Sequence, residues 1–362
     1  MSTILIKDSL RASVEAASGG SQTVLYTAKG QPTFMNIVKK FDVSEVLTGQ
    51  TGTHPAFIVN GVEKSEIYIG TYSGSIRNGE LLSLPNAAPV KATYVEYFNA
   101  AVANGAGHHM MTASEWAAVA LRCIKNKFIP KGNGYYGRDI FDSTQYGRRV
   151  DRIDPLAGIT TGDPRILTGS GPVSFRHNGK YNGISDLSGN AKDMLQGVRL
   201  YFGELQIIVN NNSASLRNLS DEDQMWKAID ARTGELIDPN GYGTTELSVK
   251  FSNSIDNKNP YTLKYTGINV STAQASTDFP VSNKVIEVLR NLALFIPSTS
   301  DLDPNLLLGG NNINPATNNN LLSRGGHWSE GSGANIYSFR ISDTRVGLST
   351  EILGSRPAYY IP

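Results

Sequence analysis

Residues 130–180 constrain the fold more than any other part of the chain. They are dense in Gly, Pro, Tyr and Arg, and they follow neither the 3.6-residue period of a helix nor the two-residue period of a strand. A loop region of this length inside a compact domain is usually functional or packed by its own side chains. The regular elements on either side must therefore hold a long irregular stretch in place.

Charge and cysteine content exclude several classes of function. The chain has 33 Lys and Arg against 32 Asp and Glu, a net charge of +1, so no strong field attracts nucleic acid or an anionic membrane surface. Its single cysteine, Cys123, excludes an internal disulfide framework and a cysteine-based zinc site. There is no apolar run of membrane-spanning length and no signal-peptide pattern at the start. We therefore expect a protein made in the cytoplasm, without membrane insertion.

The first 53 residues are expected to form a segment of their own. An amphipathic stretch ends at Gly19 and Gly20, which predicts a helix with a glycine C-cap. Two strands are predicted on either side of a turn at residues 29–32. The polar stretch 44–53 has the glycines of a linker, and we place a boundary at its end.

Turn and capping signals predict the next elements. Asn60-Gly61 lies between alternating apolar residues, which indicates a hairpin. Capping-box spacing at Thr93/Glu96 and at Thr112/Glu115 predicts two helices that begin at these residues. Further on, we expect short strands at residues 206–209, 226–237 and 247–251 and a helix at residues 283–294. Together these signals predict a mixture of helices and short strands.

Catalytic and metal-binding residues are not apparent. Cys123 falls on the apolar stripe of the second capped helix, where a buried and inert thiol is expected. His108 and His109 are adjacent and have no second histidine pair to complete a metal site, so we expect structural roles for both. We accordingly expect no cofactor and no bound metal.

Three separated motifs carry a resemblance to a known fold family. They are MTASEW at residues 111–116, ISDLSGN at residues 184–190, and RGGHW at residues 324–328 with the ending SRPAYY. In this order they resemble C-type lectin-like domains of the formylglycine-generating-enzyme type, over residues 54–362. The resemblance implies an α+β fold in which two helices pack against short, mostly antiparallel strands, with an insertion at about residues 200–320. Enzymes of this type carry two active-site cysteines or a histidine triad for iron, and this chain has neither pattern.

The chain more closely resembles the non-catalytic variable proteins of diversity-generating retroelements, which include phage tropism determinants. That resemblance implies a variable region at residues 323–362, altered by hypermutation at template adenines. It also implies a phage-tail location in the virion, a host cell-surface receptor, either protein or glycan, as the partner, and no enzymatic activity. Residues 1–53 would then attach the protein to other virion proteins or form a homo-oligomer.

A codon test selects candidate variable positions. An AAC or AAT codon randomised at its adenines encodes small, aromatic and charged residues, but not Glu or Trp. The positions that pass, which we expect to bind ligand from one exposed face, are His327, Ser329, Gly333, Tyr337, Arg340, Ser342, Asp343, Gly347 and Leu348. Three residues are expected to form the scaffold: Trp328, Arg345 and Arg356. We expect the Trp328 indole to be buried with its N–H hydrogen-bonded, and the two guanidinium groups to hydrogen-bond loop carbonyls.

Other interpretations stay open on the sequence alone. The chain could be an enzyme of the formylglycine-generating or sulfoxide-synthase type, a purely structural virion protein, or a bacterial surface protein. Residues 329–350 could also be an ordinary irregular loop network of the fold.

Overall fold

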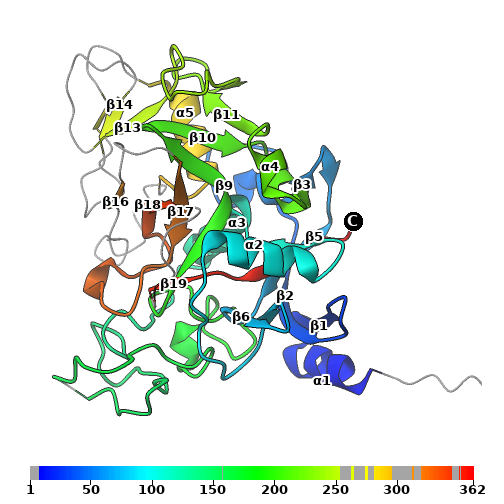
Figure 1. Cartoon of the computed structure of the whole chain (residues 1–362), viewed down its shortest axis with the longest axis vertical. Coiled ribbons are helices and arrows are strands. Elements are labelled where there is room, and N and C mark those ends of the chain that lie inside the picture. The colour runs from blue at the N-terminus through cyan, green and yellow to red at the C-terminus, as the bar shows by residue number, and fades with distance from the viewer. Residues whose placement is uncertain are drawn as a thin grey trace, which may run out of the picture.

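Strands provide most of the regular structure, and the computed structural model shows an α+β protein with mostly antiparallel sheets and few helices. Figure 1 shows two large sheets, with the loops of residues 130–180 below them. The structure describes residues 8–156, 158–252, 262–264, 274–275, 281–295, 312–313, 319–344, 350 and 352–362.

One sheet joins the two ends of the chain. Its five strands are all antiparallel, in the order β1-β2-β5-β20-β8, so the last strand of the chain lies between two strands of the first third. Ala358 is the centre of this arrangement, opposite Ile69 on one side and His109 on the other. We call it the terminal sheet; its strands are β1 Gln22–Tyr26, β2 Pro32–Lys39, β5 Glu66–Gly70, β8 His108–Met110 and β20 Pro357–Tyr359.

The terminal sheet crosses the boundary expected at residue 53. Helix α1 (Ser9–Ser18) ends at Gly19, whose φ of 62° makes the left-handed cap that the sequence predicts. β2 pairs with β5 from the far side of residue 53. Phe41 and Leu47 lie in the same apolar core as the helix that follows Thr112. Residues 9–53 thus share both a sheet and a core with the rest of the protein.

The second sheet is built around β9, which follows the ISDLSGN motif. β9 pairs with β10 on one side and with β17 on the other, both antiparallel. Strands from the stretch expected to be an insertion extend this same sheet through β10. The strands are β9 Lys192–Tyr201, β10 Glu204–Ile208, β11 Trp226–Ile229, β12 Leu236–Ile237, β13 Lys250–Ser252, β14 Thr262–Lys264, β15 Gln274–Ala275, β16 Asn312–Ile313, β17 Asn320–Arg324, β18 Phe339–Thr344 and β19 Leu353–Gly354.

Two small hairpins complete the strands. β3 (Ile58–Val59) and β4 (Val62–Glu63) flank Asn60-Gly61, where both φ angles are positive, as the sequence predicts for this turn. β6 (Gly74–Arg77) and β7 (Glu80–Ser83) form the other hairpin.

The two capped helices are confirmed at their starts. α2 (Tyr94–Ala103) and α3 (Ala113–Lys125) each begin with a complete capping box. α3 is buried on nearly every side rather than along one stripe, because its core also contains residues of both large sheets. α4 spans Leu219–Glu222 and α5 spans Asn283–Asn291; within the described ranges, no helix is long and apolar enough to cross a membrane.

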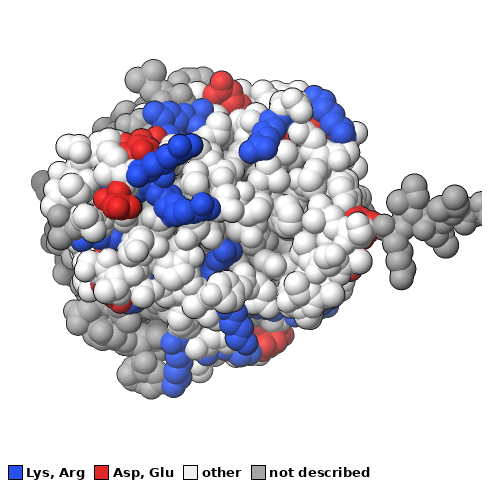
Figure 2. Space-filling view, turned by 90° about the horizontal axis from the view of Figure 1, so that it is seen from below, with Lys and Arg blue, Asp and Glu red and all other residues white. Residues whose placement is uncertain are grey.

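The irregular stretch is held by pairings within itself. Isolated bridges join Tyr135 to Arg138, Arg138 to Tyr146 and Arg149 to Ile166. The loops form the underside of the molecule, and Figure 2 shows basic side chains gathered on part of that face. In its described residues, the long loop is therefore ordered by its own backbone pairings, without a regular α-helix or sheet.

Candidate binding surface

The three sequence motifs meet in space beneath residues 327–343. Trp116, from the first motif, donates its indole N–H to the carbonyl of Ile336 at 2.9 Å. Arg356, from the chain ending, is fully buried and donates to the carbonyls of Ser185 and Gly70, each at 2.9 Å. It also pairs with Asp193, at 3.0 Å from Nε to Oδ2. These contacts fix the underside of the segment after β17.

Asn190 connects three further loops. Its backbone N–H donates to Asn133 and its carbonyl accepts from the N–H of Trp328, at 2.8 and 3.1 Å. Its amide side chain pairs with the backbone of Ile166 in both directions, at 2.8 and 3.1 Å. No local sequence pattern records this role of Asn190, since its contacts join loops that are distant in the sequence.

Glycines let these loops approach closely. A Cβ atom at Gly132 would lie 1.7 Å from the carbonyl oxygen of Ser188, and one at Gly189 would lie 2.1 Å from that of Asn133. No side chain fits at either position without moving backbone. The two loops at residues 132–134 and 188–190 are therefore tightly packed against each other.

An aromatic row lies beside the segment after β17. Tyr136 contacts Tyr135 and Trp328 edge to face, each at 5.2 Å between ring centroids, and Arg138 lies over Tyr135 at 5.2 Å. All four side chains are half-buried. The Trp328 indole nitrogen is covered but has no hydrogen-bond partner among the described residues, whereas we expected a satisfied N–H. The tyrosines were missed because they lie in the stretch without a period.

A cluster of opposite charges lies under the surface. His327 and Glu330 are 3.1 Å apart, and Lys192 is buried with its Nζ 3.6 Å from Asp343. Burial alone would raise the pKa of Glu330, but its hydrogen bond with His327 and the nearby positive charges lower it. Burial lowers the pKa of Lys192, against the attraction of Asp343. The cluster holds residues 327–330 against β9 and β18.

The expected variable positions do not all share one exposed face. Ser329 is exposed, and Gly333, Arg340, Ser342 and Asp343 are half-buried. Tyr337 is fully buried, and its hydroxyl donates to the carbonyl of Ala120 at 2.7 Å, which makes it a core residue. His327 is also largely covered, with 9% exposure. The described residues do not include Arg345, Gly347 and Leu348.

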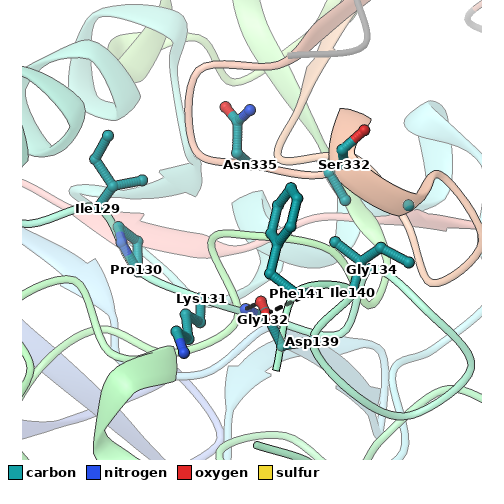
Figure 3. Close-up of a pocket in the computed structure, with 12 residues that line it drawn as sticks. Ile129, Pro130, Lys131, Gly132, Gly134, Asp139, Ile140, Phe141, Ser332 and Asn335 are labelled. Atoms are coloured by element: carbon teal, nitrogen blue, oxygen red, sulfur yellow. Dashed lines mark hydrogen bonds between the residues drawn. The ribbon is translucent and has the colours of Figure 1, made fainter. Parts of the chain in front are cut away.

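A small pocket opens between the irregular stretch and the segment after β17 (Figure 3). It has a volume of about 80 Å³. Phe141, which is 67% exposed, stands between the loop that carries Asp139 and the loop that carries Ser332 and Asn335. Burial raises the pKa of Asp139, although backbone N–H groups of Phe141 and Gly132 hydrogen-bond to its carboxylate. The pocket offers an apolar wall with polar groups at its rim.

Residues weighed for catalysis have structural partners. Cys123 is buried and its thiol donates to the carbonyl of His177; burial raises its pKa to about 12, which disfavours the reactive thiolate. His109 hydrogen-bonds Glu115 at 2.8 Å and the carbonyl of Gly107 at 2.9 Å. In the part of the chain that the structure describes, no three His, Cys, Asp or Glu residues are grouped to hold a metal ion.

No family model matches the chain, and no curated protein matches it.

Proposed function

We propose that this chain is a non-catalytic receptor-binding protein with a C-type lectin-like fold, a variable protein of a diversity-generating retroelement that acts on a phage tail. The observation that carries the proposal is the meeting of the three motifs beneath residues 327–343. Trp116, Ser185 and Arg356 come from motifs far apart in sequence, yet each contributes to one buried support. A rigid support of this kind suits a surface whose outer side chains change.

The outer side chains suit a binding role. Ser329 and Ser332 are exposed, next to the aromatic row of Tyr135, Tyr136 and Trp328. Tyrosine and tryptophan give large, rigid contact areas, and serine gives adaptable hydrogen bonding, as in antibody paratopes. We therefore place the receptor contact over Ser329, Ser332, the aromatic row and the adjoining pocket. Weak binding at one site would be raised by repeated display on a particle.

The DNA around the gene tests the retroelement part of the proposal. We expect a near-copy of the codons for residues 323–362 that differs at adenines, close to a reverse transcriptase gene. If the complete locus contains neither, this part of the proposal is wrong.

Binding to host cells tests the receptor part. Purified protein, assembled on beads to supply avidity, should bind cells that the phage infects. Ser332→Arg should abolish this binding, because a large charged side chain would cover the rim of the pocket. Ser13→Arg is the matched control, since Ser13 is exposed, as Ser332 is, but lies on α1, outside the proposed surface. Equal binding by both variants would contradict the placement of the contact.

A further inference from the structure

A second cleft lies within the irregular stretch, apart from the residues that line the pocket beside residues 331–335. It has a volume of about 500 Å³, within the roughly 300–1,000 Å³ typical of small-molecule sites. Arg148, Arg152 and Tyr146 line it together with apolar residues, which include Ile153 and Leu167. The proposed receptor contact makes no use of this cleft.

The wall of the cleft is firmly held. Arg149 is buried behind it and pairs with Asp151 through two hydrogen bonds, at 3.0 and 2.6 Å. The same guanidinium donates to the carbonyls of Thr161 and Tyr136, so that it joins three loops. Because Asp151 already neutralises Arg149, this arginine supports the wall and leaves ligand binding to its neighbours.

Arg148 and Arg152 differ from Arg149 in their exposure. Arg148 is exposed and is positioned by a hydrogen bond from its guanidinium to the Asn86 side chain at 2.5 Å. Arg152 is exposed, and its guanidinium has no hydrogen-bond or ion-pair partner among the described residues. Its φ of 63° is the left-handed region that non-glycine residues seldom adopt, and such backbone often marks a functional position.

The charges of the cleft favour a singly charged anion. Arg148 and Arg152 contribute two positive charges, and exposed Asp154 on the same lining contributes one negative charge. Because Asp151 neutralises Arg149, the lining of the cleft is left with one net positive charge. A planar guanidinium binds a carboxylate through two parallel hydrogen bonds.

The remaining lining suits a hydroxylated ring. The Tyr146 ring is 54% exposed and can cover an apolar ring face, as can Ile153 and Leu167. The Asp154 carboxylate can accept hydrogen bonds from hydroxyl groups. We propose that this cleft binds a sugar acid, with its carboxylate between Arg148 and Arg152 and its ring against Tyr146.

Calorimetric titration of the full chain tests the proposal, with methyl glucuronide as the acidic probe and methyl glucoside as its neutral counterpart. Methyl glucuronide should bind, with an affinity that falls roughly tenfold in Arg152→Gln and in Arg148→Gln. Methyl glucoside should show no binding. Arg77→Gln is the matched control, because Arg77 is an exposed arginine on β6, outside the cleft, and should leave the affinity unchanged.

Two further arms separate the sources of such a ligand. Tighter binding of a polyuronate than of methyl glucuronide would assign the cleft to a surface polysaccharide, and equal binding would assign it to free sugar acids. Either result supports the proposal. It is overturned if methyl glucoside or inorganic phosphate binds as tightly as methyl glucuronide, or if Arg77→Gln weakens binding as much as Arg152→Gln. Because cell binding by Ser332→Arg is a separate measurement, failure here leaves the receptor proposal standing.

Discussion

Tyr337 packs its ring in the main core and donates its hydroxyl to the carbonyl of Ala120 on α3. We expect Tyr337→Phe to lower the free energy of unfolding by about 1 kcal/mol, because only this hydrogen bond is lost. Tyr337→Ser should cost about 3–5 kcal/mol, because a cavity replaces the ring. Urea denaturation measures both. Ser329→Ala, on an exposed residue, is the control, and a Tyr337→Ser protein as stable as this control would contradict the buried assignment.

Arg356 is the residue that joins the chain ending to β9. Replacing it by methionine leaves the buried Asp193 carboxylate without its ion pair, which should cost about 3–5 kcal/mol. Burial already raises the pKa of Asp193, against the attraction of Arg356. The loss should therefore shrink as the pH falls and the unpaired carboxyl takes up a proton. Arg77→Met, on an exposed arginine, should change the urea midpoint little; a similar loss in both variants would count against this role.

At the scale of elements, the two capping boxes are alike in sequence but not in surroundings. Thr112 is buried, accepts from the N–H of Glu115 and donates to Asn211 at 2.6 Å, whereas Thr93 is half-buried. Thr93→Ala should cost about 1 kcal/mol, and Thr112→Ala about 2 kcal/mol or more, since Asn211 also loses its partner. Thr112→Ser keeps the hydroxyl and should recover most of the loss. Equal costs for the two alanine variants in thermal unfolding would refute this difference.

Elements with local signals could be predicted from the sequence. The helix starts at Thr93 and Thr112 and the turn at Asn60-Gly61 depend on neighbouring residues, and all are confirmed. The place of β20 between β5 and β8 depends on contacts across most of the chain, which no local pattern records. For the same reason, no local pattern predicts the contacts of Asn190. Codon chemistry admits Tyr337 as variable, but it carries no information on burial.

At the scale of the whole molecule, the buried His54 and His108 and the half-buried His177 make the fold sensitive to acid. Burial lowers the pKa of His54 to about 3 and the pKa values of His108 and His177 to about 4, from 6.5. Between pH 6.5 and about 4, the unfolded chain binds protons that the folded chain does not. The free energy of unfolding should therefore decrease as the pH is lowered. The slope should approach about 1.4 kcal/mol per pH unit for each histidine.

His177→Gln tests this directly, because the Nδ1 of His177 accepts from the N–H of Ile184 at 2.8 Å and a glutamine oxygen can replace that acceptor. In urea denaturation between pH 6 and 4.5, the free energy of unfolding of the variant should depend less steeply on pH, because one histidine no longer takes up a proton on unfolding. An unchanged slope would show that His177 takes up its proton equally in both states.

On the proposed function, the whole molecule would combine a fixed support with outer residues that are free to change. Asn190, Trp116 and Arg356 bind the support together, whereas Ser329 is exposed above it. The central claim is that selection keeps the support constant while hypermutation changes the surface. Codon chemistry alone would allow Tyr337 to vary, whereas its burial predicts that it stays constant.

Deep sequencing of this gene in its natural population measures that claim most directly. We predict adenine-derived substitutions at Ser329, Gly333, Arg340 and Ser342, with Trp116, Asn190, Tyr337 and Arg356 constant. An invariant segment 323–362, or substitutions as frequent at the buried support as at the surface, would contradict the account.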